Sequence, residues 1–268
     1  MTDLKTIMAA TRRKVAESRS TADLPELEKQ ADRHAPRGFR RAIESGSKSG
    51  PAVIAELKKA SPSRGLIRAD FDPTILSREL EMSGAAALSV LTEPEFFQGS
   101  LHNLSVASAS TALPCLRKDF ILDELQLVEA RAHGADAVLL IVAALGPHEL
   151  SQLVKRAADL RLDVLCEVHD EVELGRALEA GCDLIGVNSR DLQTFKVDTE
   201  TAIRVAEMLP YGVIAVAESG IENGAEITRL RSAGYDGFLI GEALMRAPRP
   251  GEALRKLLQE AAVGASAS

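Results

Sequence analysis

Apolar residues gather into short runs along the chain, and a segment with helical spacing follows each run. Eight such runs lie at residues 53–58, 84–90, 113–118, 134–140, 163–168, 181–187, 213–219 and 234–240. Polar or glycine-containing segments bound every run, a pattern that is typical of parallel strands buried on both faces. The sequence therefore predicts eight strands that alternate with helices.

Four of these runs open with a glycine, and the residue two positions later is Ala or Asp. The glycines are Gly84, Gly134, Gly181 and Gly234, at intervals of 50, 47 and 53 residues. Glycine directly after a helix adopts the left-handed conformation that ends it. Each interval is about twice the length of one strand-plus-helix unit, so the repeat predicts a closed (β/α)8 barrel, the TIM barrel of the α/β class. An open doubly wound sheet is the alternative, but it predicts neither eight units nor an even, doubled period.

The first 50 residues precede these units and have helical patterns of their own. Residues 3–18 are amphipathic, Asp23 is placed to cap a second helix, and residues 38–44 predict a third short one. We expect an N-terminal helical extension (1–50) packed on a barrel (51–262), with a disordered tail (263–268), in a single domain overall.

Composition narrows the class of protein. The 268 residues are 46% hydrophobic and carry a formal net charge of −7, with seven Phe, two Tyr and no Trp. An acidic chain with few aromatics is a poor candidate for binding nucleic acid or an anionic membrane. The apolar runs are too short for a membrane span, and the odd, widely spaced Cys115, Cys166 and Cys182 predict buried free thiols in a reducing compartment. We expect a cytoplasmic protein.

Polar residues mark the carboxyl end of seven of the eight predicted strands. In chain order they are Glu56 and Lys58, Thr92 and Glu93, Lys118 and Asp119, Glu167, Asn188 and Arg190, Glu218 and Ser219, and Gly241 and Glu242. Barrel enzymes carry their chemistry at this end, so the set predicts an active site there. Taken singly, Glu93 and Asp119 are equally well explained as loop caps, and Lys58 as surface charge.

The loops after the seventh and eighth strands predict a phosphate site. Gly220 and Gly241 allow close approach of the backbone, the helix that opens at Glu242 presents free N–H groups, and Lys58 adds a positive charge from the first strand. No metal constellation accompanies them. The five histidines, His34, His102, His133, His148 and His169, lack metal-ligand spacing and are expected in surface or capping roles.

The residues at the strand ends fall into longer motifs that together are highly specific. They are Ile54–Gly65 (IAELKKASPSRG), Leu88–Pro94 (LSVLTEP), Phe96–Ser100 (FFQGS), Leu116–Ile121 (LRKDFI), Glu167–His169 (EVH), Gly186–Leu192 (GVNSRDL), Ala217–Ile221 (AESGI) and Ile240–Met245 (IGEALM). On these motifs the chain resembles the indole-3-glycerol-phosphate synthases of tryptophan biosynthesis, over nearly its whole length.

The resemblance implies a lyase that works without a cofactor. Members of the family convert 1-(2-carboxyphenylamino)-1-deoxyribulose 5-phosphate to indole-3-glycerol phosphate, with release of carbon dioxide and water. The implied partner is this small phosphorylated substrate, with no nucleic acid, membrane or metal, and the chain is expected as a monomer or weak homodimer.

The resemblance also implies roles for individual residues. Lys118 would be the general acid of ring closure and Glu167 the partner carboxylate in dehydration. Glu56 would position and tune the lysines, and Lys58 would neutralise the substrate carboxylate or phosphate and act as a second acid. Asn188 completes the implied catalytic set. Which lysine donates which proton is left open by the sequence.

The remaining implied contacts bind the substrate. Asn188 and Glu218 would hold its hydroxyls and amine, and Arg190 would lie close to its carboxylate. The other implied substrate contacts are Ser61, Ser219, Phe97, Phe120 and Leu192, the last three against the anthranilate ring. Gly220, Gly241, Glu242 and Lys58 would form the phosphate end.

Two other functions compete with this interpretation. A phosphate-binding sugar isomerase such as phosphoribosylanthranilate isomerase has a similar phosphate end, but usually pairs Asp with Cys or Asp across the barrel, where Lys58 and Lys118 stand here. A catalytically silent barrel that serves as a binding subunit should have lost a lysine or a rim carboxylate, and none is lost.

Overall fold

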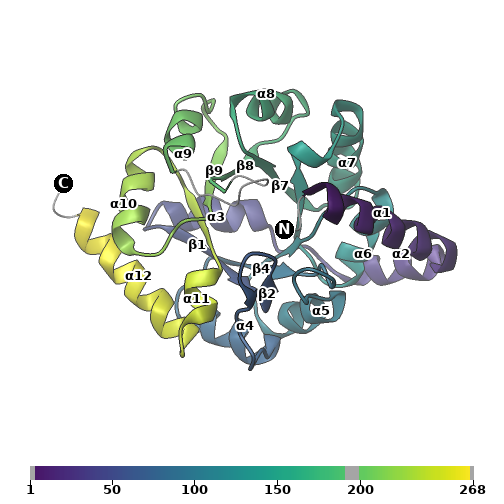
Figure 1. Ribbon diagram of the computed structural model, residues 1–268, viewed down its shortest axis with the longest axis horizontal. Helices are drawn as coiled ribbons and strands as arrows, with labels where there is room; N and C mark the ends of the chain where they lie inside the picture. The colour runs from purple at the N-terminus through teal and green to yellow at the C-terminus, as the bar shows by residue number, and fades with distance from the viewer. Residues whose placement is uncertain (1–3, 191–198, 266–268) are drawn as a thin grey trace.

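A closed barrel of eight parallel strands forms the centre of the computed structural model, which describes residues 4–190 and 199–265 (Figure 1). Each barrel strand pairs with the next barrel strand along the chain, and in the first of these pairs Ile54 lies opposite Ala87. The last strand closes on the first, with Gly237 opposite Ala52. The strands are β1 (Ala52–Leu57), β4 (Ala87–Leu91), β5 (Cys115–Lys118), β6 (Ala137–Ile141), β7 (Asp163–Val168), β8 (Leu184–Asn188), β9 (Ile214–Glu218) and β10 (Gly237–Ile240). The predicted (β/α)8 barrel is confirmed.

Helices surround the barrel and connect its strands (Figure 1). They are α4 (Pro73–Met82), α5 (Leu101–Ser110), α6 (Glu124–Ala132), α7 (Pro147–Asp159), α8 (Glu171–Glu179), α9 (Thr199–Ala206), α10 (Gly224–Ser232) and α12 (Pro250–Ala265). The four repeat glycines follow α4, α6, α8 and α10 with φ between 84° and 105°, the left-handed conformation that the sequence predicts. In the part of the chain described, no helix is long and apolar enough to cross a membrane.

Four smaller elements lie in the loops of the described ranges, and the sequence predicts only one of them. A short helix, α11 (Glu242–Arg246), opens at Glu242 as expected. The 3-10 turn η1 (Val142–Ala144) and the antiparallel hairpin of β2 (Ala60–Ser61) and β3 (Gly65–Leu66) have no clear period in the sequence, because each strand of the hairpin is only two residues long.

Three helices precede the barrel: α1 (Leu4–Thr21), α2 (Leu24–Arg33) and α3 (Phe39–Ser47). The Asp23 side chain caps α2 by accepting the N–H of Glu26, as predicted. The second helix packs along α6, and α3 contacts β1, β4, β9 and β10. Phe39 and Ile43 of α3 are fully buried with Ile54 and Leu116, so α3 closes the amino-terminal end of the barrel.

Alternation along the strands divides the core into two apolar clusters. Ile54, Leu116 and Leu165 belong to the inner cluster, which fills the barrel. Val53, Ala55 and their counterparts on other strands belong to the outer cluster, which packs against the helices. The three cysteines are free and buried, and all belong to this outer cluster, where each packs as a small apolar residue.

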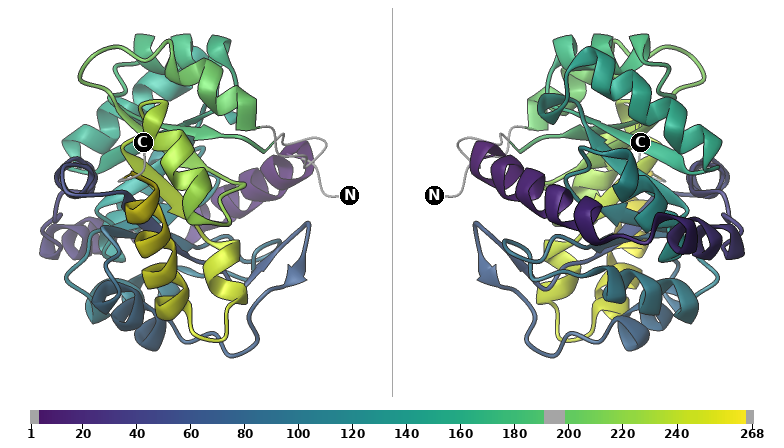
Figure 2. Two further views of the ribbon diagram at one scale, coloured as in Figure 1. Left: turned by 90° about the vertical axis from the view of Figure 1, so that its left-hand side faces the viewer. Right: turned by 90° about the vertical axis from the view of Figure 1, so that its right-hand side faces the viewer.

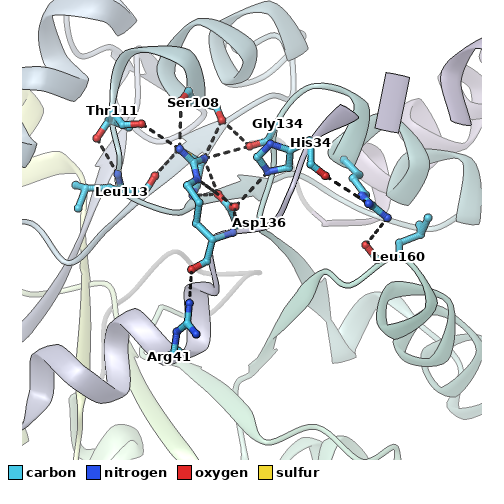
Figure 3. A network of polar contacts seen from close by, with 11 residues as sticks. His34, Arg41, Ser108, Thr111, Leu113, Gly134, Asp136 and Leu160 are labelled. Atoms are coloured by element: carbon cyan, nitrogen blue, oxygen red, sulfur yellow. Dashed lines mark hydrogen bonds and ion pairs between the residues drawn. The ribbon is translucent and has the colours of Figure 1, made fainter. Parts of the chain in front are cut away.

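A buried ion pair ties the N-terminal helices to the amino-terminal ends of the strands (Figure 3). Arg37 donates from Nε and Nη2 to Asp136 Oδ2 at 3.0 and 2.6 Å, and His34 Nε2 lies 3.1 Å from Oδ1. The backbone N–H of Cys115 also donates to Asp136, and Arg37 reaches Ser108 Oγ at 2.8 Å. Burial alone would raise the pKa of Asp136, but the hydrogen bonds from His34, Arg37 and Cys115 lower it.

Replacement of Asp136 by Ala should lower the free energy of unfolding by about 3–5 kcal/mol, because it leaves a largely buried guanidinium without its partner. Urea denaturation at pH 7 measures the change. Glu252→Ala is the matched control, because Glu252 and its partner Arg249 are both exposed and removal of a surface pair costs less than about 1 kcal/mol. Equal, small losses for both variants would contradict the prediction.

Candidate active site

A cavity of about 580 Å³ opens at the carboxyl ends of the strands. The residues to which the resemblance gives a role and that lie within the described ranges all line it: Glu56, Lys58, Ser61, Phe97, Lys118, Phe120, Glu167, Asn188, Arg190, Glu218, Ser219, Gly220, Gly241 and Glu242. Leu192 lies outside the described residues. Six of the seven polar strand ends therefore meet around one space, whereas Thr92 and Glu93, after β4, are not part of its lining.

Side chains alternate between the two faces of a strand, and this alternation makes these groups point into the barrel. Leu116, Leu165 and Val216 belong to the inner cluster, and the residue two positions further along each strand points to the same side. Those residues are Lys118, Glu167 and Glu218. By the same rule Glu56 follows Ile54 on β1, and apolar Ile141 follows Leu139 on β6, the strand without an ionisable end.

Two lysines hold three buried carboxylates in the cavity. Lys118 Nζ lies 3.3 Å from Glu167 Oε2 and also contacts Glu218 Oε2. Lys58 Nζ lies 2.8 Å from Glu56 Oε1, and Ser89 donates to the other oxygen of Glu56. The three carboxylate side chains are at most 4% exposed, so solvent screens these contacts weakly.

Neighbouring groups of opposite charge counteract the effect of burial on the ionisation of Lys118, Glu56 and Glu167. Burial alone would lower the pKa of Lys118, but Glu218, Glu167 and Glu56 raise it above its ordinary value. Burial likewise favours the neutral forms of Glu56 and Glu167, yet the lysines hold the pKa of both carboxyls below the usual range. At neutral pH the cavity therefore contains an ammonium beside ionised carboxylates.

Glu218 is the exception among the carboxylates. Burial raises its pKa to about 7, and the negative charges of Glu167 and Glu56 add to the shift, although Lys118 opposes it. Its Oε1 is buried and has no hydrogen-bond partner. A carboxyl group with these surroundings exchanges its proton near neutral pH.

Asn188 joins the carboxylates to the glycine-containing loop after β9. Its Nδ2 donates to Glu167 Oε1 at 3.2 Å, and its Oδ1 accepts from Ser219 Oγ and from the backbone N–H of Arg190. Ser219 and Gly220 have φ of 63° and 74°, a conformation that glycine adopts freely and serine adopts at a cost. The loop backbone is thus turned toward the cavity, which both residues line.

Close packing also explains the glycine after β10. A Cβ on Gly241 would meet the Glu56 side chain, so only glycine leaves that carboxylate in place. The adjoining Glu242 begins α11, and its carboxylate pairs with Arg64 of the β2–β3 hairpin at 2.9 Å. The hairpin and α1 lie at the same end of the molecule (Figure 2).

One wall of the cavity is apolar. The rings of Phe97 and Phe120 lie 6.2 Å apart at 40°, and Leu4 and Ile7 of α1 line the same cavity. Glu93 holds the loop that carries Phe97 by accepting three backbone N–H groups, from Glu95, Phe96 and Phe97. The loop-cap interpretation of Glu93 is therefore confirmed.

The N-terminal extension also reaches this loop. Lys14 of α1 forms an ion pair with the buried Glu93 carboxylate at 2.8 Å, and a longer one with Glu95. This contact joins segments 79 residues apart, which no local pattern in the sequence predicts.

The surface position expected for His169 is wrong. His169 does not lie on the surface, since its side chain is 14% exposed and sits between Glu167 and Glu173. The signal was available in the spacing: His169 follows the strand-end Glu167 by two residues and precedes Glu173 by four. Across the ranges 4–190 and 199–265, no group of three or more His, Cys, Asp or Glu side chains is arranged to hold a metal ion.

Comparison with known proteins identifies a family. A family model described as indole-3-glycerol phosphate synthase matches residues 4–257. An indole-3-glycerol phosphate synthase of Koribacter versatilis (strain Ellin345) is 58% identical over 255 residues, which cover 95% of this chain and 98% of that protein. One of Chlorobium phaeovibrioides (strain DSM 265 / 1930) is 52% identical over 78% of this chain and 80% of that protein.

Solved structures share the barrel at much lower identity. A thiamine phosphate pyrophosphorylase from Pyrococcus furiosus matches with a TM-score of 0.61 and 18% identity, over 79% of this chain and 96% of that one. This likeness concerns the fold alone.

Replacement of Gly186 by Ala should destabilise the protein by about 1–3 kcal/mol, because the new methyl group would meet Glu218 and Leu165 inside the barrel. Gly175, in α8 with open space around it, is the control, and its replacement by Ala should stabilise by about 0.5–1 kcal/mol. Urea denaturation measures both values. Equal stability of Gly186→Ala and the parent chain would contradict this packing effect.

The three buried carboxyls should titrate in a defined order. Carboxyl 13C NMR should show Glu218 changing protonation near pH 7, while Glu56 and Glu167 stay ionised to below their usual range. Difference spectra with Glu218→Gln assign its signal. Titration of Glu218 near its ordinary value would show that Lys118 outweighs burial.

Proposed function

The chain belongs to the indole-3-glycerol phosphate synthase family, and on that premise we propose that it closes, decarboxylates and dehydrates 1-(2-carboxyphenylamino)-1-deoxyribulose 5-phosphate to indole-3-glycerol phosphate without a cofactor. The observation that carries the proposal is a buried ammonium, Lys118, in contact with Glu167 and Glu218 in a cavity that has an aromatic wall. General acid–base catalysis uses a positioned proton donor beside a proton acceptor, and an aromatic wall suits an aryl substrate.

Ring closure begins when the aryl carbon that bears the carboxylate attacks the ketone carbon. Lys118 donates a proton to the ketone oxygen as negative charge develops there. Loss of carbon dioxide then returns an electron pair to the ring and restores its aromatic character. The pKa of Lys118, held above its ordinary value, keeps this group protonated before the reaction.

Dehydration removes the new hydroxyl group together with a proton. Glu167, ionised at neutral pH, accepts the amine proton, and Lys58 donates a proton to the leaving hydroxide so that water departs. Glu167 then returns this proton to the nitrogen and takes one from the CH2 carbon of the new ring, which completes the aromatic indole. Glu56 Oε1 lies 2.8 Å from Lys58 Nζ and holds that ammonium in place. The negative charge of Glu56 also raises the pKa of Lys118. The contact of Glu167 with Lys118 provides a path by which the removed proton returns to the first acid.

The cavity has a complementary group for each part of the substrate. Phe97 and Phe120 pack the anthranilate ring, and Arg190 receives its carboxylate. Asn188 and Glu218 hold the hydroxyls and amine, with Ser61 and Ser219 beside them. The backbone of Gly220, Gly241 and Glu242, with Lys58, receives the phosphate. All of these residues line the one cavity, which supports the assignment.

Lys118→Ala and Glu167→Gln should each lower turnover by about 10²–10⁴-fold and leave the fold intact, because each removes a proton-transfer group. Appearance of indole fluorescence on addition of the substrate measures the rate, and the absence of Trp keeps the protein background small. Lys155→Ala, on an exposed face of α7, is the matched control. Near-normal turnover in both active-site variants would refute the assigned roles, and no turnover in the parent chain would favour a silent barrel.

A further inference from the structure

His169 occupies a position between two carboxylates, just beyond the end of β7. Its Nδ1 lies 3.0 Å from Glu173 Oε2, and its backbone N–H donates to the same oxygen at 2.8 Å. Its Nε2 lies 3.4 Å from Glu167 Oε1, within ion-pair distance, and is buried with no hydrogen-bond partner. The ring is not part of the cavity lining, although Glu167 is.

We propose that His169 is a positioning residue: its imidazolium, anchored by Glu173, fixes the orientation and the negative charge of Glu167 in the cavity. The inference rests on the proposed function, in which Glu167 is the base of the dehydration. It assigns to this chain a pair of residues, His169 and Glu173, that act on the reaction without contact with the substrate.

The geometry gives each oxygen of Glu167 its own partners. Oε2 faces Lys118, whereas Oε1 faces Asn188 Nδ2 at 3.2 Å and His169 Nε2 at 3.4 Å. Rotation of the carboxylate would break contacts on both sides. His169 supports Oε1 from outside the cavity lining, which leaves the inner side of the carboxylate to the substrate.

The chemistry of the two neighbouring carboxylates favours a charged ring. Ionised carboxylates only accept hydrogen bonds, and a neutral imidazole donates from one nitrogen alone. If Nδ1 donates to Glu173, a neutral ring would turn the Nε2 lone pair toward the Glu167 oxygen. The doubly protonated ring instead donates from Nδ1 to Glu173 and turns a positively charged N–H toward Glu167 Oε1 at ion-pair distance.

The surrounding charges also favour the protonated form of His169. Burial alone would lower the pKa of His169, but Glu167 on its own strand and Glu173 on α8 raise it to about 10. Lys118, from β5, is the cation on the opposite side of Glu167. His169 in turn contributes, after Lys118, to holding the pKa of Glu167 below its usual range.

A kinetic comparison of four variants tests the proposal. His169→Ala should lower kcat about tenfold and change KM less than about twofold, because the ring does not touch the substrate. His169→Asn, which can still donate one hydrogen bond, should recover part of kcat. Glu173→Gln should move the alkaline limb of kcat/KM to lower pH by about one unit, since the amide no longer stabilises the imidazolium. The exposed His148→Ala is the control.

A titration of the histidine rings by NMR provides a second readout that needs no turnover. The His169 signal, assigned by its loss in His169→Asn, should titrate near pH 10 in the parent chain and at lower pH in Glu173→Gln. The proposal is overturned if the ring titrates near its ordinary value, if His169→Ala keeps kcat within about twofold, or if kcat falls while Glu173→Gln leaves the alkaline limb unmoved. Failure of the parent chain to convert the substrate overturns the proposed function, and with it the role in catalysis, while the titration still decides whether the two carboxylates hold a charged ring.

Discussion

Closure of eight parallel strands directs the last inward-facing side chain of every strand toward one space at the end of the barrel. The side chains along each strand alternate, so an apolar residue in the inner cluster determines which side the residue two positions later will face. Lys118, Glu167 and Glu218 meet for this reason, although β5 and β9 are separated by 100 residues of sequence at the point of contact. The cavity, its charges and its aromatic wall all depend on this convergence.

Burial of the converging charges sets their chemistry. An isolated carboxylate in this position would be neutral, and an isolated lysine would lose its proton. Pairing reverses both tendencies for Lys118, Glu56 and Glu167, whereas Glu218 stays closer to its neutral form. The same surroundings therefore produce a protonated acid and an ionised base side by side, which the proposed reaction needs.

The two ends of the barrel have different roles, because the amino-terminal end is packed for stability and the carboxyl end holds the candidate active site. At the amino-terminal end, α3 fills the opening with Phe39 and Ile43, and the Arg37–Asp136 pair binds the extension to β5 and β6. At the carboxyl end, the charges line an open cavity, and α1 reaches it with Leu4 and Ile7. The extension thus contacts both ends of the barrel.

The sequence by itself determined the eight strand–helix units, the glycines that end four helices, and the residues at the rim. These features depend on local periods and on glycine's access to positive φ, so they can be read along the chain. The tertiary structure alone decided which carboxylate meets which lysine, the proton affinity of Glu218 and the contact of Lys14 with Glu93. Those depend on distances between segments far apart in sequence and on the removal of water, and no local pattern encodes either quantity.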